Sequence, residues 1–250
     1  MQTHQLLFEL SHPVRYEIMH TLAVKPQRLT KIGEQVDANN PEVSRHLDRL
    51  KNADIVAKNA DGYYSITSFG QLVISMLPGL SFLSDHPGYF LDHDLSQLPV
   101  PFIHRLGELS TCTFTEGTIN NLGISKSLVQ EAEEHIYLVT KEIPRDTTSY
   151  HTRGFEGIDL KVIRHDDATI NCDTDDCRDR EFRDRLRVVQ ELPAIMVITD
   201  KAAALMFPNH KGAFDFSAGF NSTDPVFMTW CSDLFHHLWE MGSTLDEMVD

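Results

Sequence analysis

The stretch NNPEVSRHLDRLKNADIVAKNADGYYSI, residues 39–66, decides the fold of the N-terminal part of this chain. We expect a helix over residues 41–53, with Asn40 as its N-cap and Pro41 at its first position, where a missing N–H group costs nothing. Its apolar residues recur at helical spacing and would face inward: Val43, Leu47 and Leu50. The polar residues between them would point outward.

Two short β-prone runs follow this helix, Ile55–Lys58 and Tyr63–Ile66. The turn between them ends in Asp61-Gly62, a pair typical of tight hairpins, so we expect a two-stranded wing over residues 55–66. Thr67 can cap one further helix, which we expect to stop at Pro78-Gly79.

Two more helices are predicted upstream of this stretch. The first begins at Pro13 and has an apolar stripe formed by Val14, Ile18, Met19 and Leu22. The second is shorter, with Leu29, Ile32 and Val36 as its stripe, and is broken at residues 37–39. Helix, turn, helix and hairpin in this order predict an α+β winged helix-turn-helix domain, a fold that most often reads DNA.

The candidate DNA contacts follow from this placement. The N-terminal half of the helix from Pro41 would enter the major groove, where an arginine can bind a guanine edge at two points. The wing tip would lie beside the phosphate backbone. The predicted DNA-binding residues are Arg28, Asn39, Asn40, Ser44, Arg45, Arg49, Lys51 and Lys58. The alternative is a winged helix that makes only protein contacts.

Charge predicts how such a domain would bind. Residues 1–78 hold eight Lys and Arg against eight Asp and Glu, so the net charge of −15 belongs entirely to the other 172 residues. An acidic molecule repels the phosphate backbone, so one copy should bind weakly and with strong salt dependence. We therefore expect a homodimer on a palindromic operator, with half-sites about 34 Å apart.

Length and composition predict a two-domain cytoplasmic protein. The 250 residues suffice for two cores, and we divide them into a winged helix at 1–78, a packed connector at 79–101 and a second domain at 102–250. We expect no membrane span and no signal peptide, since no apolar run is long enough. Four scattered cysteines indicate reduced thiols. No nucleophile motif or Gly-rich phosphate loop occurs, so we expect neither an enzyme nor a cofactor.

The second domain alternates predicted strands with predicted helices, which favours an α/β sensing domain with a mixed or parallel sheet. Helices are expected from Ser125 or Ser127, over Arg178–Glu191 and from Asp224 to near the end. The expected strands are Ile136–Thr140, Ile158–Ile163, Ala194–Thr199 and Ala202–Phe207. The connector is rich in aromatic residues and should pack against this domain or a partner subunit rather than act as a flexible linker.

These residues resemble a known group of regulators. The N-terminal domain is similar to the arsenic-repressor-like winged helices common in archaea. Residues 93–109, which include Arg105-Leu106-Gly107-Glu108-Leu109, and residues 214–220 resemble the C-terminal domain of archaeal regulators related to the methanogenesis and filamentation regulatory protein. The resemblance implies an archaeal transcription regulator whose second domain binds an unknown small-molecule effector or dimerises.

A more distant similarity links the second domain to the phospholipase-D-like domain of archaeal sugar-responsive regulators. Catalysis in that family would need a His-x-Lys motif followed by an aspartate, and no His-x-Lys occurs here, His210 and Lys211 being adjacent. We therefore expect no phosphodiesterase activity. The alternative function is a small-molecule binder or degenerate phosphodiesterase-fold enzyme whose winged helix mediates protein contacts.

A last group of side chains leaves alternatives open. His165, Cys172 and Cys177 lie near several aspartates and could gather a divalent metal, or Cys172 and Cys177 could form a redox switch. Their spacing is not that of a zinc knuckle, so we assign no metal. The run Arg178–Arg187 interleaves basic and acidic residues, which is typical of an exposed helix with ion pairs, although it could also hold an anionic effector.

Overall fold

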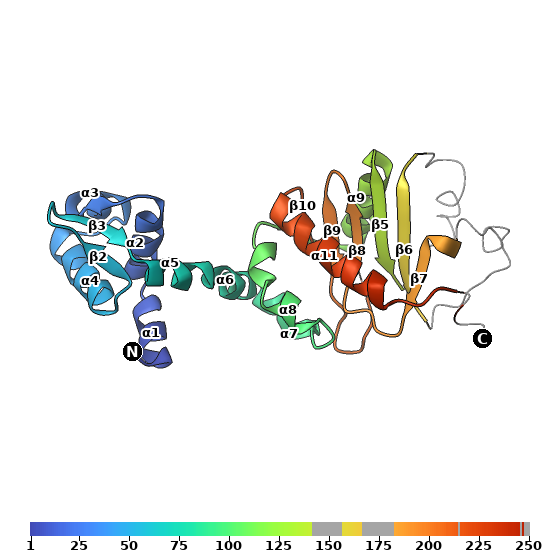
Figure 1. Cartoon of the computed structure of the whole chain (residues 1–250), viewed down its shortest axis with the longest axis horizontal. Helices are drawn as coiled ribbons and strands as arrows, with labels where there is room; N and C mark the ends of the chain where they lie inside the picture. Colours follow the sequence, from blue (N-terminus) through green and yellow to red (C-terminus); the bar gives the residue numbers. More distant parts are fainter. Residues whose placement is uncertain (142–156, 167–182, 215, 246, 248–250) are drawn as a thin grey trace. The chain divides into compact units, whose positions relative to one another are not determined.

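A computed structural model describes residues 1–141, 157–166, 183–214, 216–245 and 247. The chain divides into two compact units, Met1–Leu80 and Ser81–Asp250. Most elements of each unit are labelled in Figure 1. Among the described residues, no helix is both long and apolar enough to cross a membrane.

The first unit is a winged helix-turn-helix. Its elements are α1 (Thr3–Leu10), α2 (Pro13–Val24), β1 (Gln27–Arg28), α3 (Leu29–Gln35), α4 (Asn40–Asn52), β2 (Val56–Lys58), β3 (Tyr63–Ile66) and α5 (Ser68–Ser75). Its small sheet has the order β1-β3-β2, with both pairs antiparallel. The predicted helices from Pro13, from Leu29 and around Pro41, and the predicted hairpin, are confirmed.

One core holds this unit together. The apolar stripes predicted on α2, α3 and α4 meet there, with Ile18, Ile32 and Leu47 wholly buried. Tyr64 of the wing and Val73 of α5 close the same core. Burial of this kind is the dominant favourable term in folding.

Three details of the first unit differ from the sequence-based expectation. The N-cap of α4 is Asn39, one residue earlier than predicted. Helix α1 and the two-residue strand β1 were not predicted. The helix capped by Thr67 ends at Ser75, and α6 (Leu77–Asp85) then runs through Pro78 and Gly79 instead of stopping there. Proline is tolerated in the first turn of a helix because the N–H groups there have no intrahelical partner.

The second unit contains a seven-stranded mixed sheet in the order β4-β10-β9-β8-β5-β6-β7. Strands β5, β6 and β7 pair in parallel and the other pairs are antiparallel. The strands are β4 (Thr113–Glu116), β5 (His135–Thr140), β6 (Asp159–His165), β7 (Leu186–Val189), β8 (Ile195–Thr199), β9 (Ala203–Met206) and β10 (Ala218–Ser222). The predicted mixed sheet is confirmed.

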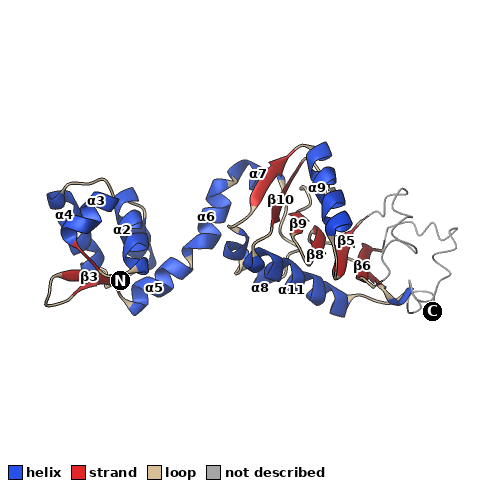
Figure 2. Cartoon of the chain, turned by 90° about the horizontal axis from the view of Figure 1, so that it is seen from above, coloured by secondary structure: helices blue, strands red, loops and turns tan. Residues whose placement is uncertain are grey.

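Helices cover both faces of this sheet, as Figure 2 shows for α9 (Thr118–Glu131) and α11 (Pro225–Met241). Successive side chains of a strand point to opposite faces. On β5, Ile136 accordingly packs in the core on the α9 side, and Val139 packs in the core on the α11 side. The shorter helices are α7 (Pro87–Asp92), α8 (Val100–Ile103) and the 3₁₀ turn Leu106–Leu109.

The aromatic connector packs within the second unit. Phe82, Tyr89 and Leu98 are buried in the same core as the inner face of α11. The Tyr89 hydroxyl accepts a hydrogen bond from the backbone N–H of Phe207 at 2.9 Å. The compact unit therefore begins at Ser81 and includes most of the connector.

Two helix predictions in this unit are wrong. Helix α9 begins at Thr118, after Gly117 with a φ of 98°, rather than at Ser125 or Ser127. Residues 186–189 form β7 beside β6 instead of continuing a charged helix, because Leu186 and Val188 are buried in the sheet. Residues 178–182 of that expected helix lie outside the described residues. Strands β4 and β10 were not predicted.

Candidate nucleic-acid interface

Helix α4 is anchored at its start and along one face. The Asn39 side chain accepts a hydrogen bond from the backbone N–H of Glu42 at 3.0 Å and so caps the helix. The preceding turn uses Asp37 with a φ of 48°, a conformation that Asp and Asn adopt more readily than most residues. Val43, Leu47 and Leu50 are fully buried. Because this side of α4 is held in the core, the orientation of the opposite face of the helix is fixed.

Arg45 lies on that opposite face, with Ser44 beside it. The Arg45 side chain is exposed and has no hydrogen bond or ion pair with any residue that the structure describes. Its five N–H donors are available to a base edge or a phosphate. Among the residues predicted to read DNA, Arg45 has the placement that such a role requires.

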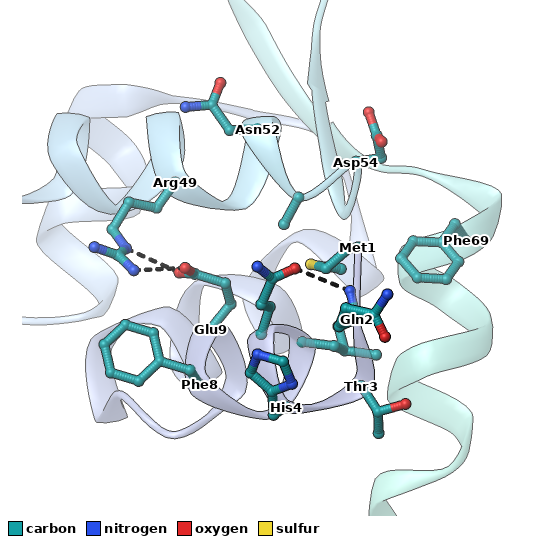
Figure 3. A pocket seen from close by; sticks show the side chains of 13 residues that line it. Met1, Gln2, Thr3, His4, Phe8, Glu9, Arg49, Asn52, Asp54 and Phe69 are labelled. Carbon is teal, nitrogen blue, oxygen red and sulfur yellow. Dashed lines mark hydrogen bonds and ion pairs between the residues drawn. The ribbon is translucent and has the colours of Figure 1, made fainter.

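Arg49 is held differently. It lies about 40° around the helix from Arg45, on the side next to α1. Its Nε donates to Glu9 Oε2 at 2.9 Å, and its Nη2 donates to Glu9 Oε1, as the dashed lines in Figure 3 show. The guanidinium carbon also lies 5.2 Å from the centre of the Phe8 ring. A DNA contact by Arg49 would have to compete with this carboxylate.

Glu9 also serves a second arginine. Arg15 on α2 is only 4% exposed, and its Nε lies 3.3 Å from Glu9 Oε2. The Arg15 guanidinium donates to two backbone carbonyls of α1, those of Phe8 and Glu9. The hydrogen bond from Arg49, together with the charges of Arg15 and Arg49, lowers the pKa of Glu9 despite its burial. Glu9 is thus ionised at neutral pH and joins α1, α2 and α4.

The wing adds cations on the strands of the small sheet. Lys58 lies over the Tyr64 ring at 5.1 Å, and Arg28 of β1 lies over the Tyr63 ring at 4.9 Å. The turn is closed by Asn59, whose side chain accepts from the N–H of Tyr63 at 2.8 Å. Strand pairing of β1 with β3 brings Arg28 to the wing, a placement that the sequence alone did not predict.

The remaining predicted contacts flank α4. Asn40 is exposed at the start of the helix, whereas the Asn39 side chain is occupied by capping. Lys51 pairs with Asp48 at 3.3 Å on the exposed surface. Most of the predicted DNA-binding residues thus belong to α4 or the wing. The side-chain polar groups of Asn39 and Arg49 already have partners, whereas those of Arg45 and Ser44 have none among the described residues.

A hollow of about 1360 Å³ opens between α1, the end of α4 and the start of α5. Figure 3 shows the side chains that line it, with Phe69 on one side and Arg49 on the other. Most of the lining comes from α1, and the Glu9–Arg49 pair lies at its edge. No nucleophile–base arrangement occurs among its lining residues.

The candidate metal and redox residues are not brought together by the part of the chain that is described. His165 Nδ1 lies 3.1 Å from Asp166 Oδ1, and no group of three potential metal ligands occurs among the described residues. Cys172 and Cys177 lie outside them. The two described thiols are Cys112, whose pKa burial raises to about 11, and Cys231, whose pKa burial raises further. High pKa values make these thiols unreactive at neutral pH.

Comparison with known proteins supports the fold of the first unit. Residues 12–58 match the family model of the bacterial regulatory protein, arsR family. No curated protein matches the chain. The N-terminal unit is therefore a winged helix-turn-helix domain of the arsR type, which supports a transcription regulator that binds DNA.

Three solved structures are similar to the chain. TrmBL2, an archaeal chromatin protein that binds DNA, is 12% identical over 93% of this chain and 94% of its own, with a TM-score of 0.45. NolR from Sinorhizobium fredii is 25% identical over 31% and 79%, with a TM-score of 0.29. The transcriptional repressor BigR from Xylella fastidiosa is 29% identical over 30% and 81%, with a TM-score of 0.26. All three TM-scores lie below 0.5 and carry no argument about function. The implied archaeal origin and type of C-terminal domain stay predictions.

Proposed function

We propose that this protein is a homodimeric cytoplasmic transcription regulator that reads a palindromic operator with α4 and the wing of each copy. One observation carries the proposal. Arg45 is exposed and unpaired among the described residues, on a helix whose opposite face is locked into the core. A rigid helix with a free arginine on its outer face is what base recognition in the major groove needs.

The wing supplies the backbone contacts in this proposal. Arg28 and Lys58 are exposed, and the tyrosine rings beneath them orient their charges without neutralising them. Phosphate contacts of this kind position a protein on the duplex but carry no sequence information. We therefore assign specificity to Arg45 and Ser44, and general affinity to the wing.

An apolar stripe supports the homodimer. Phe69, Leu72 and Met76 follow one another at spacings of three and four residues, which places them on one side of α5 and its C-cap, and Leu80 follows in α6. All four are exposed in a single copy, Leu72 at 66% and Met76 at 79%. Exposed stripes of large apolar residues mark interaction surfaces. A second copy of this chain would cover the stripe, and its two-fold symmetry would match a palindrome.

The second unit is the proposed effector domain, and we propose no catalytic activity for it. A small molecule that binds one arrangement of the dimer more tightly than another would shift the population between them. The fit of the two α4 helices to their half-sites would change with that population. Effector binding and operator binding would then be coupled reciprocally.

The test is the variant Arg45→Ala in the full-length protein, with Lys126→Ala on α9 as the matched loss of one positive charge. Arg45→Ala should lower affinity for the protein's own promoter by roughly tenfold to a hundredfold, as expected for loss of one two-point base contact. Its melting temperature should stay nearly unchanged, because the Arg45 side chain makes no hydrogen bond or ion pair with the described residues. Promoter binding equal to that of Lys126→Ala would contradict the assignment of α4.

A further inference from the structure

Two histidines meet where α2 begins beside α4. His12 is the N-cap residue of α2 and His46 lies on α4. Their ring centres are 4.2 Å apart, with the ring planes inclined by 45°. The Nδ1 atoms of both rings are buried and have no hydrogen-bond partner among the described residues. Buried polar atoms without partners are rare in folded proteins and each calls for an explanation.

The charges around His46 disfavour its protonation. Arg15 of α2 and Arg45 of α4 act on His46 from two elements, and Glu42 Oε1 is 3.8 Å from His46 Nε2. From α1, the Glu9 carboxylate is engaged by Arg15 and Arg49. Burial lowers the pKa of His46 from its ordinary value of 6.5, and the positive charges of His12, Arg15 and Arg45 lower it further, whereas Glu42 opposes them.

The sign of the pH effect follows. A folded-state pKa below the unfolded value means that folding favours the neutral ring. The stabilisation from the neutral His46 ring is complete above about pH 6.5 and is lost as the pH falls through the folded-state pKa of His46. Two imidazolium rings in contact would also repel each other, so acid should force the rings apart.

We propose that the His12–His46 contact is a proton-sensitive joint that holds α4 in its reading position, so that acid lowers the protein's preference for its operator. This inference rests on the proposed function and adds the proton as a regulator of the same site. His46 lies one residue after Arg45, so movement of the joint would shift the arginine that reads the operator. The two histidines are positioning residues, since they act through the placement of Arg45.

The direction of the effect separates this joint from general electrostatics. Protonated histidines add positive charge, which alone would strengthen binding to DNA of any sequence. A displaced α4 would instead weaken binding to the operator relative to random DNA. The ratio of the two affinities is therefore the quantity to measure.

The experiment uses the full-length protein with two fluorescent duplexes of equal length, one from its own promoter and one of random sequence, at about pH 7.5 and about pH 5.5. For the wild type we expect the affinity ratio to fall about tenfold in acid. His46→Gln and His12→Asn, which cannot gain charge, should flatten this dependence. His20→Asn is the matched control, because exposed His20 lies against the Tyr16 ring on the same α2 and should leave the profile as in the wild type.

Two results would overturn the joint. They are a wild-type ratio that does not change with pH, and a His46→Gln variant that keeps the full wild-type dependence. Absence of promoter preference at every pH would instead contradict the proposed function. In that case an NMR titration of the histidine ring resonances tests whether the His12–His46 contact responds to protons. A His46 pKa below 6.5, with lower amide protection factors in α4 on acidification, supports the proposed joint, and a pKa at or above 6.5 rejects it.

Discussion

Glu9 and Arg49 are forty residues apart in sequence, yet the Glu9 carboxylate accepts two hydrogen bonds from the Arg49 guanidinium. This pair ties α1 to the flank of α4, and Arg15 shares the same carboxylate. Helix α1 has no fully buried residue, although Leu6 and Leu10 pack partly buried against the core, so these polar contacts add to a small apolar attachment. The two arginines of α4 therefore differ in role. Arg49 holds the helix against α1, and we propose that Arg45 binds DNA.

The first prediction concerns this attachment. Glu9→Gln leaves the buried Arg15 without its carboxylate partner and should lower the free energy of unfolding by about 1–3 kcal/mol. Amide exchange in α1 should become faster. The matched control is Glu34→Gln, which breaks the exposed pair with Lys31 and should cause no measurable change. Equal stability of the two variants in urea denaturation would show that Glu9 does not hold α1.

The second prediction tests the cap of α4. Asn39→Ala removes the acceptor for the Glu42 N–H and should cost about 1 kcal/mol of stability. Asn40→Ala, one residue later, should be nearly neutral because the Asn40 side chain does not cap the helix. Circular dichroism during urea unfolding measures both. The reverse order would place the cap at Asn40, as the sequence alone suggests.

The third prediction compares two helical glycines. A Cβ at Gly70 in α5 would lie 2.3 Å from the backbone oxygen of Ile55, so Gly70→Ala should destabilise the protein by about 1–3 kcal/mol. At Gly123 in α9 a Cβ would meet nothing within 4 Å. Gly123→Ala should therefore stabilise it by about 0.5–1 kcal/mol, the difference in helix propensity. Urea unfolding of both variants measures the two effects, and stabilisation by Gly70→Ala would contradict the close packing of α5.

The fourth prediction addresses self-association. Leu72→Glu places a charge on the exposed stripe of α5 and should raise the dimer dissociation constant by at least about tenfold, since a buried charge at an interface is costly. Val24→Glu is the matched control, because Val24 is 81% exposed at the end of α2, outside the stripe. Sedimentation velocity gives the oligomeric state. A Leu72→Glu variant that dimerises as well as Val24→Glu would remove the stripe as the interface.

Local signals account for the parts of the fold that the sequence predicted. The proline at the start of α4, the apolar spacing of Val43, Leu47 and Leu50, and the Asp-Gly turn of the wing all act within a few residues. Strand β7 was missed because its charged surroundings resemble a helix, and only pairing with β6 makes a strand of it. The two residues of β1 likewise form a strand only through β3.

The residues of the candidate site could be predicted from the sequence, but the contacts that each of them makes could not. The sequence placed Arg45 and Arg49 four residues apart on one helix, where spacing alone gives both the same role. The difference in role between Arg45 and Arg49 depends on Glu9, which contacts Arg49 only because α1 folds against α2 and α4. Arg28 was among the predicted DNA-binding residues, but its position beside the wing depends on the β1–β3 pairing, which the sequence did not predict.

The most direct test of the central claim is a salt titration of the full-length protein on DNA from its own promoter, with random DNA of equal length as the control. The account predicts a clear preference for the promoter and a log–log slope of roughly −5 to −9, as expected for about six to ten phosphate contacts made by a dimer. Equal binding to both duplexes at every salt concentration would contradict the claim that α4 reads DNA sequence.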